Sequence, residues 1–268
     1  MTQNAQAAGR GRLDGLVAFV TGASRGIGEA IARAYAHEGA SICLAATDAK
    51  RLAEVESGLG VPAARAMTVA LDVGDGDAVH AAVAACEQRF GRIDVLVNSA
   101  GVYKPASFLD YDIDDFERLI RVNLYGTIHT MQATLAGMQQ RGFGRIVNIA
   151  STAGKWASRN QSAYNVSKHA VVGLTRCVAL EAAGTGVTVN AICPGFVKTD
   201  MLNNLFDGQA QASSVSADAA IAGALARVPI GRMLEPREIA DLAVHLATRE
   251  AGGMTGQSVL VDGGMLFV

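Results

Sequence analysis

The chain has 268 residues, 50% of them hydrophobic, and a formal net charge of −2 at pH 7. Its length suits one large α/β domain, and no apolar run reaches the roughly 18 residues that a membrane-spanning helix needs. The near-neutral charge gives no electrostatic reason to expect a nucleic acid or an acidic membrane surface as a partner.

Short apolar segments alternate with helical patterns along nearly the whole chain. Residues 1–12 are polar and rich in glycine and alanine, and we interpret them as a flexible tail ahead of a single domain spanning 13–268. The predicted strands are 16–21, 41–46, 66–71, 93–98, 144–150, 187–193 and 257–261. The predicted helices lie near 26–38, 48–57, 75–90, 112–140, 162–183 and 236–248.

The predicted strands are rich in Val, Ile, Leu and Ala without alternation, which is typical of strands buried on both faces. Together with the intervening helices they indicate a single Rossmann-type α/β domain. Its core would be a doubly wound seven-stranded parallel sheet with helices on both faces and a ligand at the carboxyl ends of the strands. The four cysteines form no CxxC pair, which favours a reducing cytoplasm, and we expect no metal site.

The first strand runs into a glycine-rich turn, Thr21-Gly-Ala-Ser-Arg-Gly-Ile-Gly28, and a helix begins at once. Small residues let the backbone approach a pyrophosphate, and the N-terminus of the helix supplies N–H donors and partial positive charge. The glycines are spaced GxxxGxG, unlike the usual GxGxxG, but their place between a strand and a helix indicates a dinucleotide site.

The end of the second strand bears on the choice of cofactor. Folds that bind NAD place an acidic residue there, and this chain has Ala46 followed by Thr47 and Asp48. Asp48 could accept a ribose hydroxyl or could cap the helix that begins at Ala49. Without an acid at 46, and with Arg25 in the glycine turn, we favour NADP(H), with NAD(H) as the other option.

Three later polar segments lie near the same predicted edge. Asp72-Val73 ends the third strand and Asn98-Ser-Ala-Gly101 ends the fourth, where an acid can meet the adenine amine and a small-residue turn can pass beneath the cofactor. Each of these could equally be a simple strand-end turn. Asn123 borders the apolar stripe of helix 112–140, so its amide must be hydrogen-bonded, and Gly126 predicts a local distortion of the helix beside it.

The stretch from Ser151 to Lys168 predicts a proton-transfer site. Tyr164 and Lys168 are four residues apart, which places them on one face of helix 162–183. A nearby ammonium lowers a phenol pKa that is ordinarily about 10. The Ser151 hydroxyl, arriving from a strand end, would hold a substrate oxygen beside that phenol.

Taken together, these segments resemble the short-chain dehydrogenase/reductase family. The resemblance rests on TGASRGIG at 21–28, Asp72-Val73, NSAG at 98–101, Asn123, Ser151, Tyr164 with Lys168, and Pro194-Gly195, and it covers residues 13–264. It implies four catalytic residues: Tyr164 as general acid or base, Lys168 as the group that lowers its pKa, Ser151 on the substrate oxygen, and Asn123 holding a relay water. The cofactor residues that it and the edge positions imply are Gly22, Ser24, Arg25, Gly26, Ile27, Gly28, Thr47, Asp72, Val73, Asn98, Ala100, Gly101, Tyr164, Lys168, Pro194, Gly195, Val197 and Thr199.

The resemblance also implies a substrate class and an assembly. We expect a small-molecule ketone or secondary alcohol, held by Val102, Tyr103, Lys155 to Ala157, and a lid near 200–230. A 3-oxoacyl-type ketoreductase is the favoured activity. An NAD-dependent 3-hydroxy acid or cyclic alcohol dehydrogenase, resembling 3-hydroxybutyrate dehydrogenase, is the enzyme alternative. A non-catalytic nucleotide-binding protein is the alternative from another class.

Tyr-bearing helices of this family pack between subunits. The small and apolar residues Ala170, Val171, Gly173 and Leu174 would provide such a face, and the C-terminal segment 265–268 is apolar. The expected assembly is a homotetramer.

Overall fold

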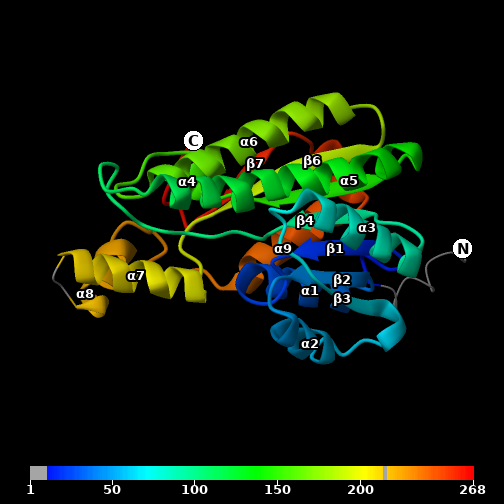
Figure 1. The fold of residues 1–268 in the computed structure, drawn as a ribbon, viewed down its shortest axis with the longest axis horizontal. Coiled ribbons are helices and arrows are strands. Elements are labelled where there is room, and N and C mark those ends of the chain that lie inside the picture. Colours follow the sequence, from blue (N-terminus) through cyan, green and yellow to red (C-terminus); the bar gives the residue numbers. More distant parts are fainter. Residues whose placement is uncertain (1–10, 214–215) are drawn as a thin grey trace, which may run out of the picture.

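The computed structural model describes residues 11–213 and 216–268. Its centre is one all-parallel sheet in the order β3-β2-β1-β4-β5-β6-β7 (Figure 1). The strands are β1 Val17–Thr21, β2 Ser41–Ala46, β3 Ala66–Ala70, β4 Val95–Asn98, β5 Gly144–Ile149, β6 Val187–Pro194 and β7 Ser258–Val261. The predicted α/β class, strand number and parallel direction are confirmed.

The main helices follow the predicted order closely. They are α1 Gly26–His37, α2 Ala49–Ser57, α3 Gly76–Phe90, α4 Ile113–Ile120, α5 Gly126–Gln140, α6 Ser162–Ala182, α7 Asp200–Ser213, α8 Ala217–Leu225 and α9 Pro236–Ala247. Short 3₁₀ turns lie at η1 Ala63–Arg65, η3 Thr152–Gly154 and η4 Glu250–Gly253, and a π-helical turn, η2, spans Arg121–Tyr125.

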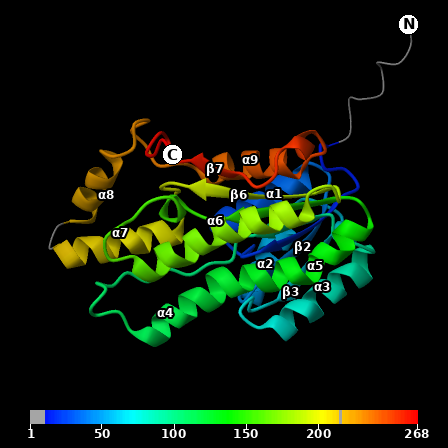
Figure 2. The same ribbon diagram turned by 90° about the horizontal axis from the view of Figure 1, so that it is seen from above.

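Helices cover both faces of the sheet, as the unbroken apolar strands predict. One face packs against α1, α2 and α9 through residues such as Ile31, Leu52 and Ile239. The other packs against α3, α5 and α6 through Val79, Met131 and Ala179. Figure 2 shows α5 and α6 on one side of β6, and α1 and α9 on the other. The chain order reverses between β1 and β4, and ligands of such sheets bind at that reversal, beyond the carboxyl ends of the strands.

The long helix predicted over 112–140 contains the expected distortion. The π-helical turn η2 joins α4 to α5, and the Gly126 N–H donates to the Arg121 carbonyl oxygen, five residues back. Gly126 has a second reason to be glycine. A Cβ atom added there would lie 2.5 Å from Val73 Cγ2, because the helix crosses directly over the segment after β3.

We expect Gly126→Ala to lower the free energy of unfolding by about 1–3 kcal/mol, because the added methyl group overpacks against Val73. This outcome opposes helix propensity, which favours alanine over glycine by roughly 1 kcal/mol. Urea unfolding measures the change. Gly137→Ala on the same helix is the matched control, since its Cβ would meet only the far ends of two flexible side chains, Arg141 at 3.0 Å and Glu87 at 3.6 Å. Equal effects of the two substitutions would contradict the packing explanation.

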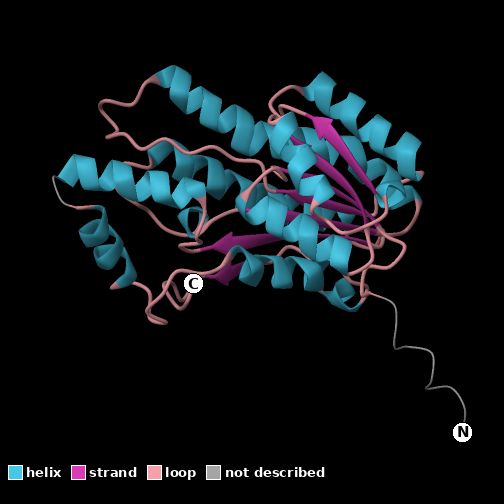
Figure 3. Ribbon diagram, turned by 90° about the horizontal axis from the view of Figure 1, so that it is seen from below, coloured by secondary structure: helices cyan, strands magenta, loops and turns pink. Residues whose placement is uncertain are grey.

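The segment after β6 differs from the prediction. Residues 200–213 form the helix α7, whereas the predicted helices leave this part of the lid segment out. Leu202 and Phe206 pack against Ala224 of α8 and against Phe196. This tertiary contact stabilises a helix that the Asn, Gly and Gln residues of this segment do not predict. Figures 2 and 3 show α7 and α8 beside one another, beyond the carboxyl ends of β6 and β7.

The last two residues of the predicted tail, Gly11 and Arg12, contact the folded domain. Residues 1–10 lie outside the described residues. The Arg12 N–H donates to Glu38 Oε2 (2.8 Å), and a Cβ at Gly11 would lie 2.1 Å from the Glu38 carbonyl oxygen. Gly11 and Arg12 therefore belong to the folded domain. No helix within 11–213 and 216–268 is both long and apolar enough to cross a membrane.

Candidate active site

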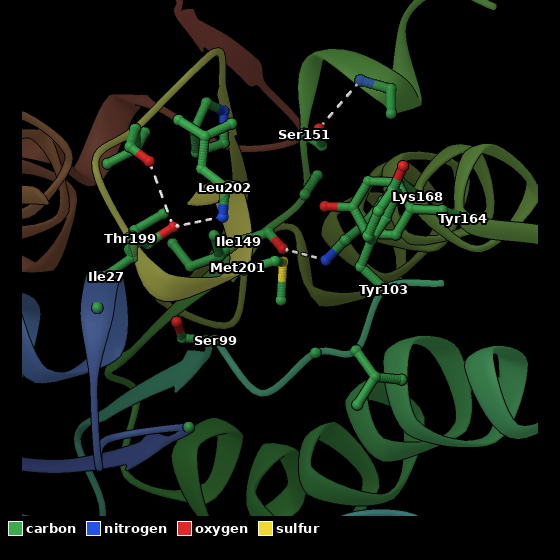
Figure 4. A pocket seen from close by; sticks show the side chains of 18 of the residues that line it. Ile27, Ser99, Tyr103, Ile149, Ser151, Tyr164, Lys168, Thr199, Met201 and Leu202 are labelled. Carbon is green, nitrogen blue, oxygen red and sulfur yellow. Dashed lines mark hydrogen bonds between the residues drawn. The ribbon is translucent and has the colours of Figure 1, made fainter. Parts of the chain in front are cut away.

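A cleft of about 1040 Å³ lies at the carboxyl ends of the strands. It collects segments from the whole chain: the turn after β1, the ends of β2 to β6, the start of α6, and α7. Figure 4 shows Tyr103, Tyr164, Lys168 and Ser151 toward one side of this cleft, and Ile27, Thr199 and Leu202 toward the other.

Tyr164 and Lys168 lie one helical turn apart on α6, and both line the cleft, as their spacing predicts. The Lys168 Nζ atom is 5.7 Å from the centroid of the Tyr164 ring. It donates a hydrogen bond to the carbonyl oxygen of Ile149, the last residue of β5 (2.8 Å). The ammonium is therefore anchored between the sheet and the phenol.

Ser151 reaches the same place from the end of β5. Its oxygen accepts from the Ala153 N–H (3.1 Å), which caps the short turn η3. That turn packs directly on α6, because a Cβ at Gly154 would lie 2.7 Å from the Lys168 carbonyl oxygen. The strand end and the helix are thus held close enough for a hydroxyl and a phenol to share one substrate atom.

The electrostatics differ from the sequence expectation. Burial raises the pKa of Tyr164, and hydrogen bonding by the Ser151 hydroxyl opposes that rise. Burial also lowers the pKa of Lys168 from 10.5 to about 8. The prediction that the ammonium holds the phenol pKa below its usual value is therefore wrong for the protein alone. Desolvation of the phenol outweighs the opposing effect of the Ser151 hydroxyl.

Tyr103 lies edge-on to the catalytic candidate, with the rings of Tyr103 and Tyr164 5.2 Å apart at 85°. Burial and the neighbouring Tyr164 raise the Tyr103 pKa, so it stays a neutral phenol. Of the predicted substrate contacts, Val102, Tyr103, Trp156 and Ala157 line the cleft. Lys155, which follows η3 directly, does not line it, and its contact with a substrate stays a prediction.

The glycine-rich turn forms the opposite wall. Gly22, Ser24, Arg25, Gly26, Ile27 and Gly28 all line the cleft, as predicted. Gly22 has φ +64°, and a Cβ there would lie 2.7 Å from the backbone nitrogen of Ala100. At Gly28 a Cβ would lie 2.3 Å from the Gly22 carbonyl oxygen. The residues present fit a dinucleotide, because this backbone cradle at the start of α1 has no room for side chains.

Asp48, just after β2, caps the following helix, which was one of the two roles that the sequence allowed. The Asp48 carboxylate accepts from the Arg51 N–H (3.1 Å) and so caps α2. Its other oxygen lies 3.8 Å from Arg25 and 3.8 Å from Arg51. Ala46 and Thr47 line the cleft, and Thr47 is exposed there. The two residues that line the cleft at this strand end, Ala46 and Thr47, are therefore not acidic and would not repel a ribose phosphate.

Asp72 and Val73 line the cleft at the end of β3. The Asp72 carboxylate accepts from Arg121 (3.1 Å) and from the Gly74 N–H (2.9 Å). Arg121 and the nearby Arg118 also line the cleft. Sequence reasoning missed both, because the contact of Arg121 with Asp72 joins segments that are distant in the sequence.

Two predicted site residues, Asn98 and Asn123, do not line the cleft. The Asn98 amide donates to Asn148 Oδ1 on β5 (2.9 Å), and its oxygen accepts from Thr130 (2.6 Å). Asn148 in turn donates to Thr175 on α6 (2.9 Å). The Asn98 side chain therefore ties strands and helices together, and its part in binding the cofactor stays a prediction. Ala100 and Gly101, which follow it, do line the cleft.

The side chain of Asn123 is fully engaged by protein groups. Its oxygen accepts from the Val102 N–H (2.8 Å), and its amide donates to the Val102 carbonyl oxygen (3.0 Å) and to Ser167 Oγ (3.0 Å). The amide therefore meets the expected need for hydrogen bonds by tying the backbone of the segment after β4. Its part in a proton relay stays a prediction.

The segment after β6 completes the cleft. Pro194, Gly195, Val197 and Thr199 line it, as predicted. A Cβ at Gly26 would lie 3.2 Å from Thr199 Cγ2, so the glycine turn and this segment close around the same space. Further lining residues that the sequence did not single out are Gln161, Arg159, Asn204 and Met265.

Comparisons with known proteins agree with this geometry. A family model described as Enoyl-(Acyl carrier protein) reductase matches residues 22–266. The uncharacterized oxidoreductase YxjF of Bacillus subtilis is 40% identical over 249 residues, covering 92% of this chain and 97% of that protein. The 3-oxoacyl-[acyl-carrier-protein] reductase FabG of Vibrio harveyi is 37% identical over 256 residues, covering 96% and 99%.

A solved structure is equally similar. The crystal structure of an actinorhodin polyketide ketoreductase variant with NADPH has a TM-score of 0.90 and 37% identity to this chain. The match covers 96% of this chain and 99% of that one. The similarity therefore extends over nearly the whole chain.

Proposed function

Because the chain belongs to the short-chain dehydrogenase/reductase family and is an oxidoreductase, we propose that it reduces the ketone of a 3-oxoacyl-type substrate to a secondary alcohol with NADPH. One observation carries the proposal. The phenol of Tyr164, with the Ser151 hydroxyl and the Lys168 ammonium around it, lines the same cleft as the glycine cradle. The names of the FabG relative and of the ketoreductase structure with NADPH support the substrate class and the cofactor.

The roles of the residues follow from their places. When bound, NADPH supplies the hydride that adds to the ketone carbon. Tyr164 donates its proton to the ketone oxygen, while Ser151 donates a hydrogen bond to the same oxygen and holds it in place. The Lys168 ammonium, fixed by Ile149, favours the phenolate that remains after proton transfer.

The other cleft residues would hold the cofactor. The glycine turn would hold the pyrophosphate, Thr47 and Arg25 the adenosine ribose phosphate, and Asp72 and Val73 the adenine. Pro194, Gly195 and Val197 would fix the nicotinamide, with Thr199 near the pyrophosphate. All of these positions line one continuous cleft.

The proposal is tested by assaying purified protein on a panel of ketones and alcohols with both cofactors. We expect NADPH oxidation with 3-oxoacyl thioesters, and much weaker turnover with NADH. Preferred oxidation of a 3-hydroxy acid or cyclic alcohol by NAD would establish the dehydrogenase alternative instead. Cofactor binding without turnover of any substrate would favour the non-catalytic reading.

Cofactor preference gives a sharper prediction at Thr47, which is exposed at the end of β2 and lines the cleft. Thr47→Asp places a carboxylate beside the ribose 2′-phosphate. We expect the KM for NADPH to rise at least about tenfold, corresponding to about 1.4 kcal/mol, because like charges repel. The KM for NADH should change far less. Thr47→Asn, of the same size but neutral, is the control, and an equal effect of Asn and Asp would place the phosphate elsewhere.

We also propose that the described residues between 200 and 230 cover the substrate end of the cleft, within the single domain that includes residues 11–213 and 216–268. Met201, Leu202 and Leu205 of α7 and Arg227 after α8 line the cleft. The Arg227 guanidinium stacks on the Trp156 ring at 4.5 Å. This stacking would connect the lid segment to the wall that carries Ser151.

We further propose a cytoplasmic homotetramer. Large apolar side chains are exposed along α4 to α6, including Val166 (49% exposed) and Leu180 (79%), and at the C-terminal end, where Phe267 is 89% exposed. Gly173 adds open space on α6. Val171 is buried within the chain, so it does not belong to such a face and its place in the sequence prediction was wrong.

A further inference from the structure

A second cavity, of about 500 Å³, lies at the amino ends of the strands, where β5 and β6 begin. Four glycines form much of its wall, which leaves room for a ligand to approach the backbone. Its chemistry comes from Arg145, Thr188 and Arg249, with Phe143 between the loops. None of the described residues that line it is an aspartate or a glutamate.

Arg145 is buried, with 4% of its surface exposed, although no carboxylate among the described residues that line the cavity neutralises it. Its Nε donates to the Thr248 carbonyl oxygen (2.9 Å), and its Nη1 donates to those of Gly144 (2.8 Å) and Gly186 (3.1 Å). Its Nη2 makes no hydrogen bond within the described part of the chain. That nitrogen faces Gly252, where a Cβ would lie 3.6 Å away. Two N–H donors of a buried cation are therefore left for a ligand.

A second cation stands beside the first. The guanidiniums of Arg145 and Arg249 each lie 4.5 Å from the centroid of the Phe143 ring. Burial, and then repulsion by Arg249, lower the pKa of Arg145. Two like charges that contact one aromatic ring, with no acidic side chain among the described residues that line their cavity, favour the binding of an anion in the cavity.

Thr188 supplies an independent sign of a missing partner. It is the register partner of Arg145 across the β5–β6 pair, so the two side chains leave the same face of the sheet. Thr188 is 5% exposed, and its hydroxyl finds no hydrogen-bond partner among the described residues. A buried hydroxyl without a partner is unfavourable and unusual.

We propose that this cavity is a binding site for a phosphate group. The two guanidiniums match the charge of about −1.5 to −2 that a phosphate monoester carries at neutral pH. Arg145 Nη2, Arg249 and the Thr188 hydroxyl are its donors, and the glycine walls admit the molecule that carries the phosphate. The site lies at the opposite ends of the strands from the catalytic cleft and is independent of the reaction proposed there.

The test is a calorimetric titration of the full chain with inorganic phosphate at constant ionic strength. NADPH is present at a saturating concentration, so that the glycine turn of the cleft is filled. We expect saturable binding of one phosphate per chain. Glycerol phosphate distinguishes a carried phosphate group from the free ion by tighter binding, and acetate, with a single charge, should bind at least about tenfold more weakly.

Two variants decide whether the binding is at this cavity. Thr188→Val removes the unpartnered hydroxyl at constant volume, and Arg249→Gln removes an exposed charge. Each should weaken phosphate binding at least about tenfold, and Thr188→Val should not lower the melting temperature in the absence of phosphate. Arg237→Gln, with a side chain 87% exposed on α9, makes the same charge change elsewhere and should bind like the unmodified protein. Absence of saturable binding, or equal binding by all three variants, would overturn the proposal.

Discussion

Tyr164→Phe is expected to lower kcat/KM for ketone reduction by about 10²–10⁴-fold, the range that a positioned general acid contributes. The substitution removes only the phenolic oxygen, while the ring keeps its edge-on contact with Tyr103, 5.2 Å away. The glycine cradle is built from other elements, so NADPH affinity should stay within a few-fold of its original value. Steady-state kinetics and a fluorescence titration of NADPH measure the two quantities separately.

Tyr103→Phe is the matched control for this experiment. It removes the same group from the same cleft, one ring away from the proposed acid. Because Tyr103 supplies no proton in the proposed reaction, its variant should retain most of the turnover. Similar losses in the two variants would show that the cleft needs hydroxyl groups in general and would remove the special role of Tyr164.

Lys168→Met is expected to abolish most activity and, at neutral pH, to make the protein more stable. Burial lowers the Lys168 pKa from 10.5 to about 8, which corresponds to about 3 kcal/mol against the folded state when the amine is charged. Losing the hydrogen bond to Ile149 offsets roughly 1 kcal/mol of that gain. A net gain of about 2 kcal/mol would raise Tm by about 4–8 °C for a chain of this size.

The sign of the pH dependence follows from linkage. Below about pH 8 the lysine is charged in both the folded and the unfolded chain, and the full penalty of burying the charge is present. Between about pH 8 and 10.5 the unfolded chain binds a proton that the folded chain does not, so the stability of the unmodified protein rises with pH. The advantage of Lys168→Met should therefore shrink above pH 8 and disappear near 10.5.

Thermal unfolding over this pH range measures the effect. Lys198→Met is the control, since that lysine is 57% exposed and pairs with Glu235, and its removal should not raise Tm. A lower Tm for Lys168→Met at pH 7 would contradict the buried charge penalty. Higher stability together with lost activity would show that Lys168 is needed for the reaction although it lowers the stability of the folded protein.

Local sequence predicts the catalytic frame well, because its signals lie within single elements. The glycine turn after β1 requires positive φ and close backbone approach, and both are found at Gly22. The four-residue spacing of Tyr164 and Lys168 needs only a helix. The distortion beside Asn123 also follows from one sequence window, although the contact of Gly126 with Val73 that requires the glycine does not.

What sequence could not predict depends on contacts between distant segments. The polar stretch after Met201 becomes helical because Phe206 packs against α8. Asn98 points toward Asn148, which is visible only once the β4–β5 register is known. The pairing of Arg145 with Thr188, on which the proposed phosphate site depends, is likewise a matter of register. The raised pKa of Tyr164 depends on how completely the folded chain excludes water.

The buried line of side chains from Thr130 through Asn98 and Asn148 to Thr175 has a consequence for how the enzyme can diversify. These hydrogen bonds tie β5 to β4 and to α6. They therefore fix the position of Ser151, just after β5, relative to the helix that bears the phenol. None of these four groups lines the cleft. Substitutions in α7, α8 and the segment after β4 can therefore reshape substrate preference while the alignment of hydroxyl and phenol is preserved.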